Sequence, residues 1–344
     1  PFESIEQERA ARQEAVSGLI QIMRQLLPVL LRRLGKIPDP RNPKKLKHRL
    51  TVLMVYGILT FVFQYGSRRA ANGEITRPMF EHNLRLLFPQ LQKLPHADTL
   101  CRLLARIEVE RIEQAHIDLV NRLIRNKKFS RYLINNCYPI AIDGTQKCVF
   151  SVLGDEHWLQ RRTGRKVDPD SEEPPNYQYY VYVLEASLSF RNGMVIPLMS
   201  EFLEYEPGED EARKQDCETK AFHRLAARLK KAFPRLPIML LLDGLYPNGP
   251  IMERCRTYHW DFMIVLKDGS LPSVWEEYYS LRHEQAENRM QQSWGERRQH
   301  FQWVNLIRYH FGPNAKKFLD LHVVVCREQW EVLDPDTLAI VTKE

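Results

Sequence analysis

Two stretches of the sequence share one design, in which a run of apolar residues leads into an Asp-Gly pair. Residues 138–147 (YPIAIDGTQK) bring such a run to Asp143, and residues 238–249 (IMLLLDGLYPNG) bring another to Asp243. Each pattern predicts a buried strand that carries a carboxylate at its C-terminal end, where the glycine begins a turn. The C-terminal strand ends of open α/β sheets are where chemistry is usually located. Two carboxylates that meet there would form a site for a divalent metal ion.

Such a pair suits magnesium chemistry on phosphate esters. Mg²⁺ is typically held by one or two carboxylates, with substrate phosphates and water completing its shell. Two such ions about 3.5–4 Å apart promote an in-line phosphoryl displacement. We therefore expect Asp143 and Asp243 to be both metal-binding and catalytic. The alternative, that each aspartate only starts a turn, is common for Asp-Gly, but two copies at matching places in the strand order favour the metal site.

Composition limits the class of protein. The 344 residues are 44% hydrophobic, enough for a sizeable core, and the formal net charge is +7, which fits a polyanionic partner without requiring one. Six cysteines lie scattered without a CxxC pair, which argues against a zinc module or a disulfide framework and suits a reducing compartment. The longest apolar run, 50–63, is too short to span a bilayer. We expect a cytoplasmic, nucleoid-associated protein with no membrane segment.

Residues 1–130 are expected to form a helical domain that binds DNA. Apolar residues at helical spacing predict helices over 3–34, 50–64, 77–87, 98–107 and 109–126. A proline-rich link carries a basic cluster, which could hold phosphates or could be a solvated linker. A plain helical bundle is the open alternative for the domain, because no helix-turn-helix signature is sharp. The candidate DNA-binding residues of the cluster are Arg41, Lys44, Lys45, Lys47 and Arg49.

Residues 131–270 are expected to form an α/β catalytic core. Strands are predicted over 138–142, 177–189, 194–201, the Asp243 run and 261–266, with helices over 217–233 and 250–257. An Asn-Gly turn at 192–193 joins two strands, and Pro197 indicates an edge or a bulge. The polar stretch 155–175 is expected to be a long loop whose basic residues contact DNA: Arg161, Arg162 and Lys166.

This order of elements is a ribonuclease H-like arrangement, in which the first strand and the strand after the first long helix lie side by side. Asp143 and Asp243 would then be near neighbours despite their separation in sequence. Glu185, inside an otherwise apolar strand, is a candidate supporting acid, and Lys267 and Asp268 are candidates for lining a DNA groove. Residues 271–344 are expected to add a charged helix over 273–289 and a β-rich insertion, with strands over 297–309 and 318–326 and a further pair of strands over 329–342.

The sequence resembles the DDE-class transposases of bacterial insertion sequences over nearly the whole chain. The resemblance is carried by IPDPRNPKKLKHRL, LPHADTLCRLL, YPIAIDGTQK, QDCETKAFHRL and, most specifically, LLLDGLYPNGPIMERCRTYHWDFMIVLKDG. It implies a ribonuclease H-like catalytic domain in which Asp143 and Asp243 are the first two metal-binding acids. It also implies DNA cleavage and strand transfer with Mg²⁺ or Mn²⁺.

The same resemblance implies a third acid, a glutamate on a helix that follows the β-rich insertion. No such helix precedes Glu344, so the third acid is expected beyond residue 344, and the 344 residues are expected to be a truncated transposase or a relic. The partner would be double-stranded DNA, at the transposon ends and the target, with a homodimer bound to it. Two other classes stay open: a DNA-binding protein without catalysis, and a ribonuclease H-like nuclease of another type.

Overall fold

The computed structural model describes residues 29–62, 67–75, 81, 84–85, 88–155, 157–163, 176–204, 217–333 and 340–343. The chain divides into two compact units, 1–130 and 131–344. Most of the helices expected over 3–34 and 77–87, the acidic loop before residue 217, Lys166 and Glu344 lie outside the described residues.

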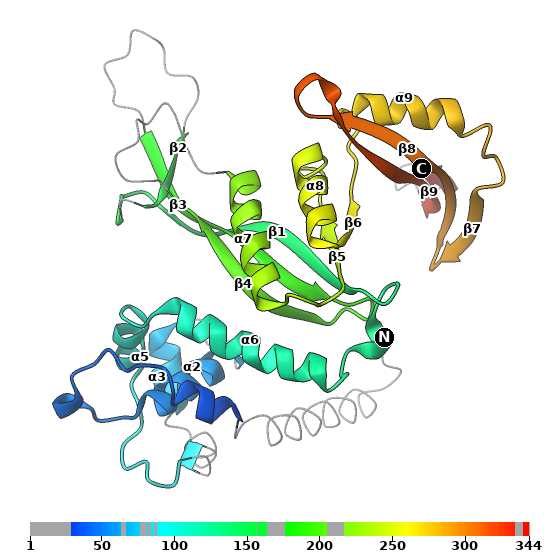
Figure 1. Cartoon of the computed structure of the whole chain (residues 1–344). Helices are drawn as coiled ribbons and strands as arrows, with labels where there is room; N and C mark the ends of the chain where they lie inside the picture. The colour runs from blue at the N-terminus through cyan, green and yellow to red at the C-terminus, as the bar shows by residue number, and fades with distance from the viewer. Residues whose placement is uncertain are drawn as a thin grey trace. The chain divides into compact units, whose positions relative to one another are not determined.

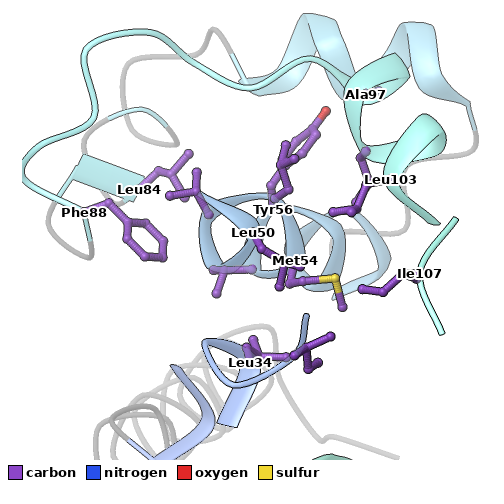
Figure 2. Close-up of a cluster of buried hydrophobic side chains, with 14 of the residues drawn as sticks. Leu34, Leu50, Met54, Tyr56, Leu84, Phe88, Ala97, Leu103 and Ile107 are labelled. Carbon is purple, nitrogen blue, oxygen red and sulfur yellow. The ribbon is translucent and has the colours of Figure 1, made fainter. Parts of the chain in front are cut away.

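The first unit is helical in its described part. Its helices are α2 (Leu50–Val62), α3 (Arg68–Ile75), α5 (Ala97–Leu104) and α6 (Val109–Arg125), with a short 3₁₀ helix η1 (Pro43–Lys45) in the proline-rich link. Because α2 is apolar on nearly all sides, it forms the centre of the core. Figure 2 shows Leu50, Met54 and Tyr56 of this helix beside Leu34, Leu84, Phe88, Leu103 and Ile107.

The start of α5 is fixed by a side-chain cap. The His96 ring accepts a hydrogen bond from the Asp98 backbone N–H, which would otherwise lack a partner in the first turn. The expectation that this segment begins a helix is therefore confirmed. The helix α3 was not expected, because the sequence RRAANGEI carries no apolar stripe.

The second unit contains a six-stranded mixed sheet (Figure 1). Its strands are β1 (Tyr138–Phe150), β2 (Leu159–Thr163), β3 (Asn176–Ser189), β4 (Val195–Leu203), β5 (Ile238–Leu242) and β6 (Asp261–Ile264). The spatial order is β2-β3-β1-β5-β6, with β4 also paired to β3. The β1–β3 and β3–β4 pairs are antiparallel, whereas β1–β5 and β5–β6 are parallel. The prediction of a mixed α/β sheet is confirmed.

Two details of the expected sheet were wrong. The first strand does not end at Asp143, because its antiparallel pairing with β3 continues to Phe150 on one edge after the pairing with β5 has stopped on the other. The expected loop 155–175 contains β2, whose polar sequence LQRRT gave no apolar signal. The turn at 192–193 and the irregularity at Pro197 are both confirmed, the latter as a register shift between β3 and the edge strand β4.

Two helices pack side by side against this sheet (Figure 1). Helix α7 (Glu218–Ala232) buries Ala221, Leu225, Ala226 and Leu229 as expected, together with Phe222. Its middle turns are held to β4 by Glu201, which pairs with Arg224 at 2.5 Å and Arg228 at 2.6 Å. Helix α8 (Gly249–Tyr258) begins where the Asn248 side chain accepts from the Ile251 N–H.

A second, antiparallel sheet follows in the order β10-β9-β8-β7 (Figure 1). Its strands are β7 (Arg289–Trp294), β8 (Arg297–Phe311), β9 (Lys317–Leu333) and β10 (Ile340–Lys343), and α9 (Pro272–Leu281) packs on β8. The sequence did not predict β7, which is exposed along its whole length, and the expected helix 273–289 ends earlier. Short 3₁₀ turns η2 (Ser130–Tyr132) and η3 (Pro313–Ala315) complete the described elements.

No helix in the described ranges combines the length and the apolar character that crossing a membrane requires.

The contact between α8 and the second sheet generates a stability prediction. A Cβ atom at Gly249 would lie 2.2 Å from Cδ2 and 2.3 Å from Cγ of Phe311, too close for either to remain in place. Gly249→Ala should lower the free energy of unfolding by roughly 1–3 kcal/mol, since α8 or the ring must move. All six tryptophans lie in the second unit, so urea unfolding followed by tryptophan fluorescence measures this change.

Gly269→Ala is the matched control, because a Cβ there meets nothing within 4 Å. Equal midpoints for the two variants would contradict the close packing at Gly249.

Candidate functional site

The site lies where the parallel pairing of β1 with β5 stops. The register runs from Tyr138 opposite Ile238 to Ile142 opposite Leu242, and Asp143 and Asp243 are the next residue on each strand. Because parallel strands in register present equivalent positions to the same face, the two aspartates emerge together at this point. Both are exposed, whereas the residues that precede them are buried. The expected neighbourhood of the two strands is confirmed.

The two carboxylates reach this point by different local structures. Asp143 remains within β1, where it faces Glu185 of β3, and its Oδ1 accepts from the Gly144 N–H at 2.9 Å. After Asp243 the chain leaves the sheet in a turn. There the Asp243 Oδ1 accepts from the Leu245 N–H at 3.0 Å and the Asp243 carbonyl accepts from the Tyr246 N–H. In each carboxylate, Oδ1 thus accepts a hydrogen bond from a nearby backbone N–H, and Oδ2 remains available to a ligand.

A third acid, Glu218, lies close to this pair and was missed by the sequence analysis. It occupies the first turn of α7, and its two oxygens accept from two tyrosine hydroxyls. Tyr182 of β3 donates to Oε1 at 2.7 Å, and Tyr246 donates to Oε2 at 2.9 Å. We call this arrangement of three residues the tyrosine–glutamate clamp. It connects β3, α7 and the turn after β5.

The clamp lies against the backbone of Gly144, the residue that follows Asp143. A Cβ at Gly144 would lie 2.4 Å from the Tyr182 hydroxyl oxygen and 2.8 Å from Glu218 Oε1. Glycine is therefore required at 144 for close approach, and the turn that the sequence suggested there does not form. The residue that follows Asp143 is thus held directly against the clamp.

The electrostatics of Tyr246 show that the acids share one neighbourhood. Burial raises the pKa of Tyr246 well above its ordinary value, and the hydrogen bond to Glu218 and the charges of Glu218, Asp243 and Asp143 raise it further. The pKa of Tyr182 is raised by burial and by Glu218, with a smaller contribution from Asp143. Both phenols therefore remain protonated and donate their hydrogen bonds to Glu218.

The donor set at this point fits a hard cation that keeps water or phosphate ligands. Neither Asp143 nor Asp243 forms an ion pair within the described part of the chain, and both are open to solvent. Within those same ranges no group of three or more His, Cys, Asp or Glu side chains is arranged to hold a metal ion. The described residues therefore do not supply a full set of metal ligands. A Mg²⁺ site, however, usually takes only one or two carboxylates from the protein.

Glu185 and Lys267 lie near the residues that carry the two carboxylates. Glu185 accepts from Lys147 Nζ at 2.6 Å, so its charge is compensated by a lysine on the same strand as Asp143. Lys267 lies over Gly244, where a Cβ would meet its side-chain carbons at 2.4–2.8 Å. The groove-lining role expected for Lys267 stays a prediction.

The basic cluster of the first unit divides into two groups. Arg41 is paired with Asp39 at 2.7 Å and donates to the His48 carbonyl, so its side chain stabilises the link. The hydrogen bond from Arg41 holds the pKa of Asp39 below its ordinary value. The others are exposed and form no ion pair among the described residues: Lys44, Lys45, Lys47 and Arg49. Lys47 and Arg49 line a pocket of about 480 Å³ with Lys93.

The remaining DNA-binding candidates lie on or near the edge strand β2. Arg161 donates to Gln178 Oε1 and lies 5.1 Å from the Tyr180 ring centroid, and Arg162 is exposed opposite Tyr177. Lys166 is outside the described residues. Their role in binding DNA stays a prediction.

Comparison with known proteins gives one match at the family level. Residues 31–120 match the model of the family described as DDE_Tnp_1-associated. No curated protein matches the chain.

Two transposase structures are similar at low score. The piggyBac transposase synaptic complex with hairpin DNA gives a TM-score of 0.31 at 11% identity, over 86% of this chain and 57% of that one. The Mos1 transposase paired-end complex with the left transposon end gives 0.19 at 14% identity, over 69% and 64%. The chain therefore spans under two thirds of the length of either, and these scores are too low to support an argument.

The clamp generates a prediction about stability. Glu218→Ala removes the acceptor of two hydroxyls, one of them on Tyr246, which is only 1% exposed. The free energy of unfolding of the second unit should fall by about 1–3 kcal/mol for a buried hydroxyl left without a partner. Urea unfolding followed by tryptophan fluorescence measures it. Glu277→Ala, at an exposed helical glutamate on α9, is the control and should change little; the same loss in both variants would argue against the clamp.

Proposed function

We propose that this chain is the DNA-binding and metal-binding part of a DDE-class DNA transposase. In this proposal it cleaves phosphodiester bonds at transposon ends and transfers the freed strand to target DNA. The observation that carries the proposal is the in-register β1–β5 pairing, which brings Asp143 and Asp243 to one point of the sheet. The match of residues 31–120 to a family named for its association with DDE transposases supports it independently of the sheet.

The order of the strands supports the ribonuclease H-like part of the proposal. The sheet reads β4-β3-β1-β5-β6, and α7 connects β4 to β5. This is the order expected for that fold, with the first acid on the central strand and the second on its parallel neighbour. The strand order thus supports the ribonuclease H-like fold, and the two aspartates support the catalytic role.

In the proposed mechanism Asp143 and Asp243 would hold Mg²⁺ or Mn²⁺. When bound, such an ion activates the attacking oxygen and stabilises the leaving one. The protein's own residues position the two carboxylates. Glu218 accepts hydrogen bonds from Tyr182, which lies against Gly144, and from Tyr246, whose backbone N–H donates to the Asp243 carbonyl. Lys267, over Gly244, supplies a positive charge for a phosphate of the strand that is cut.

The proposed partner is double-stranded DNA, bound by a homodimer. The exposed cations of the proline-rich link provide the sequence-independent grip on the phosphates, because each such contact releases counterions. Arg161 and Arg162 on β2 would extend that grip in the second unit.

The metal site generates the first prediction of this proposal. Asp143→Asn and Asp243→Asn should each weaken Mn²⁺ binding by at least about tenfold, because each removes a charged ligand. Isothermal titration calorimetry measures the affinity, and tryptophan fluorescence checks that the second unit remains folded. Asp261→Asn, at the amino end of β6 in the same sheet, is the control and should bind Mn²⁺ normally. Unchanged binding in both aspartate variants would refute a shared metal site.

A second prediction concerns DNA. Replacing Lys44, Lys45, Lys47 and Arg49 together by alanine should weaken duplex binding. It should also reduce the slope of log K against log salt by about 0.9 for each phosphate that the variant no longer neutralises. Fluorescence anisotropy at several salt concentrations measures both quantities.

The control removes the same charge from exposed positions elsewhere in the first unit: Arg106, Arg122, Arg125 and Lys128. If the control variant loses as much affinity and slope as the test variant, the link has no special role in holding DNA.

A further inference from the structure

A pocket of about 590 Å³ lies in the second sheet, away from the aspartates of the first. Its floor is formed by residues of β7, β8 and β9, and residues at the C-terminal end of α9 line another side. The register explains the floor, since Gln291, His300 and Arg327 face one another across the three strands. Arg289 lies on the same face two residues before Gln291.

The charges that line this pocket are all of one sign. Three arginines and two histidines contribute to the lining, and no aspartate or glutamate does: Arg282, Arg289, Arg327, His283 and His300. Neutral groups make up the rest, among them Tyr278 and Tyr279 from α9. An acid-free concavity with three guanidinium groups has a positive potential that attracts anions.

The pocket arginines differ from their neighbours in the same sheet. Arg297 is paired with Glu328, and Arg308 is paired with Asp320 at 3.1 Å. None of the three pocket arginines has a carboxylate partner among the described residues. Two arginines outside the pocket, Arg297 and Arg308, are thus compensated by carboxylates, whereas in the described part of the chain the three that line it are not.

Arg282 is prepared for a ligand by its surroundings. Its guanidinium lies 5.0 Å from the Tyr279 ring centroid, and Tyr279 stacks on Trp275. Its Nε is buried and has no hydrogen-bond partner among the described residues. Burial raises the pKa of Tyr278, while the charges of Arg282 and Arg327 act in the opposite direction, so both guanidiniums lie near that hydroxyl.

We propose that this pocket binds a phosphate group of a DNA strand. Guanidinium groups form paired, charge-assisted hydrogen bonds with phosphate oxygens, and a buried Nε without a partner is the kind of donor that such a ligand satisfies. The volume exceeds that of a single phosphate and admits an attached sugar or base, for which Tyr279 offers an aromatic face. The phosphate specificity follows from the pocket alone, whereas the choice of DNA as its source rests on the proposed function.

The test uses the full chain in EDTA, so that no metal at the aspartates contributes. The double variant Arg289→Gln/Arg327→Gln should bind a fluorescein-labelled 20-mer about tenfold more weakly or worse, because two charged hydrogen-bond donors are removed. The slope of log K against log salt should fall by about one for each arginine that contacts a phosphate. Fluorescence anisotropy with single-stranded and duplex 20-mers measures both.

The matched control is Arg297→Gln/Arg308→Gln, which removes the same charge from the same sheet at compensated positions. It should bind DNA within about twofold of the unchanged chain. Equal losses in the two double variants would overturn the proposal, since they would reduce the effect to net charge. Unchanged binding in the pocket variant would also overturn it. Tryptophan fluorescence checks that both variants are folded.

A competition arm separates a DNA strand from a free nucleotide as the source of the phosphate. ATP without metal should displace the labelled 20-mer only at millimolar concentration, as expected for a pocket that takes one phosphate of a longer chain. Displacement at micromolar ATP would overturn the assignment to DNA.

Failure here is distinguishable from failure of the proposed function. DNA binding by the pocket variant is measured without metal, and Mn²⁺ binding by Asp143→Asn is measured without DNA, so each result tests one proposal. The pocket variant should leave Mn²⁺ binding unchanged.

Discussion

The parallel pairing of β1 with β5 is the constraint on which the candidate site depends. It holds two strands about a hundred residues apart in fixed register, so that the residues after Ile142 and Leu242 emerge beside each other. The apolar residues of both strands are buried, so a slip of register is costly because it would draw a charged aspartate toward the buried part of the sheet. The position of the aspartates is thus set by the core rather than by contacts between the carboxylates themselves.

The sheet alone does not orient the carboxylates, because β1 continues beyond Asp143 while β5 ends before Asp243. The tyrosine–glutamate clamp links these unlike segments. Glu218 binds one phenol from β3 and one from the turn after Asp243, and Gly144 leaves room for Tyr182 and Glu218. A charged acceptor with two neutral donors is a strong and fully satisfied arrangement for a half-buried glutamate. Through Glu218 it connects β3, the partner of β1, to the turn that follows β5.

The sequence was sufficient where the signal is local and periodic. The apolar run of β5, the buried stripe of α7 and the bulge at Pro197 could all be predicted from short windows, and the strand order then gave the neighbourhood of Asp143 and Asp243. It was insufficient where a feature depends on distant partners. Glu218 is an ordinary first-turn acid until Tyr182 and Tyr246 are placed against it. The strands β2 and β7 are polar, and they form because a neighbouring strand supplies their hydrogen bonds. The structural role of Arg41 depends on its ion pair with Asp39, which the sequence does not indicate.

The most direct test of the central claim is to locate Mn²⁺ by anomalous diffraction in crystals of the chain. The account predicts a manganese peak bonded to one carboxylate oxygen of Asp143 and one of Asp243 at the same time, with water in the remaining positions. Crystals of Asp243→Asn should lack that peak. Manganese bound to only one of the two aspartates, or found only elsewhere on the protein, would contradict the claim that the β1–β5 register builds a shared cation site.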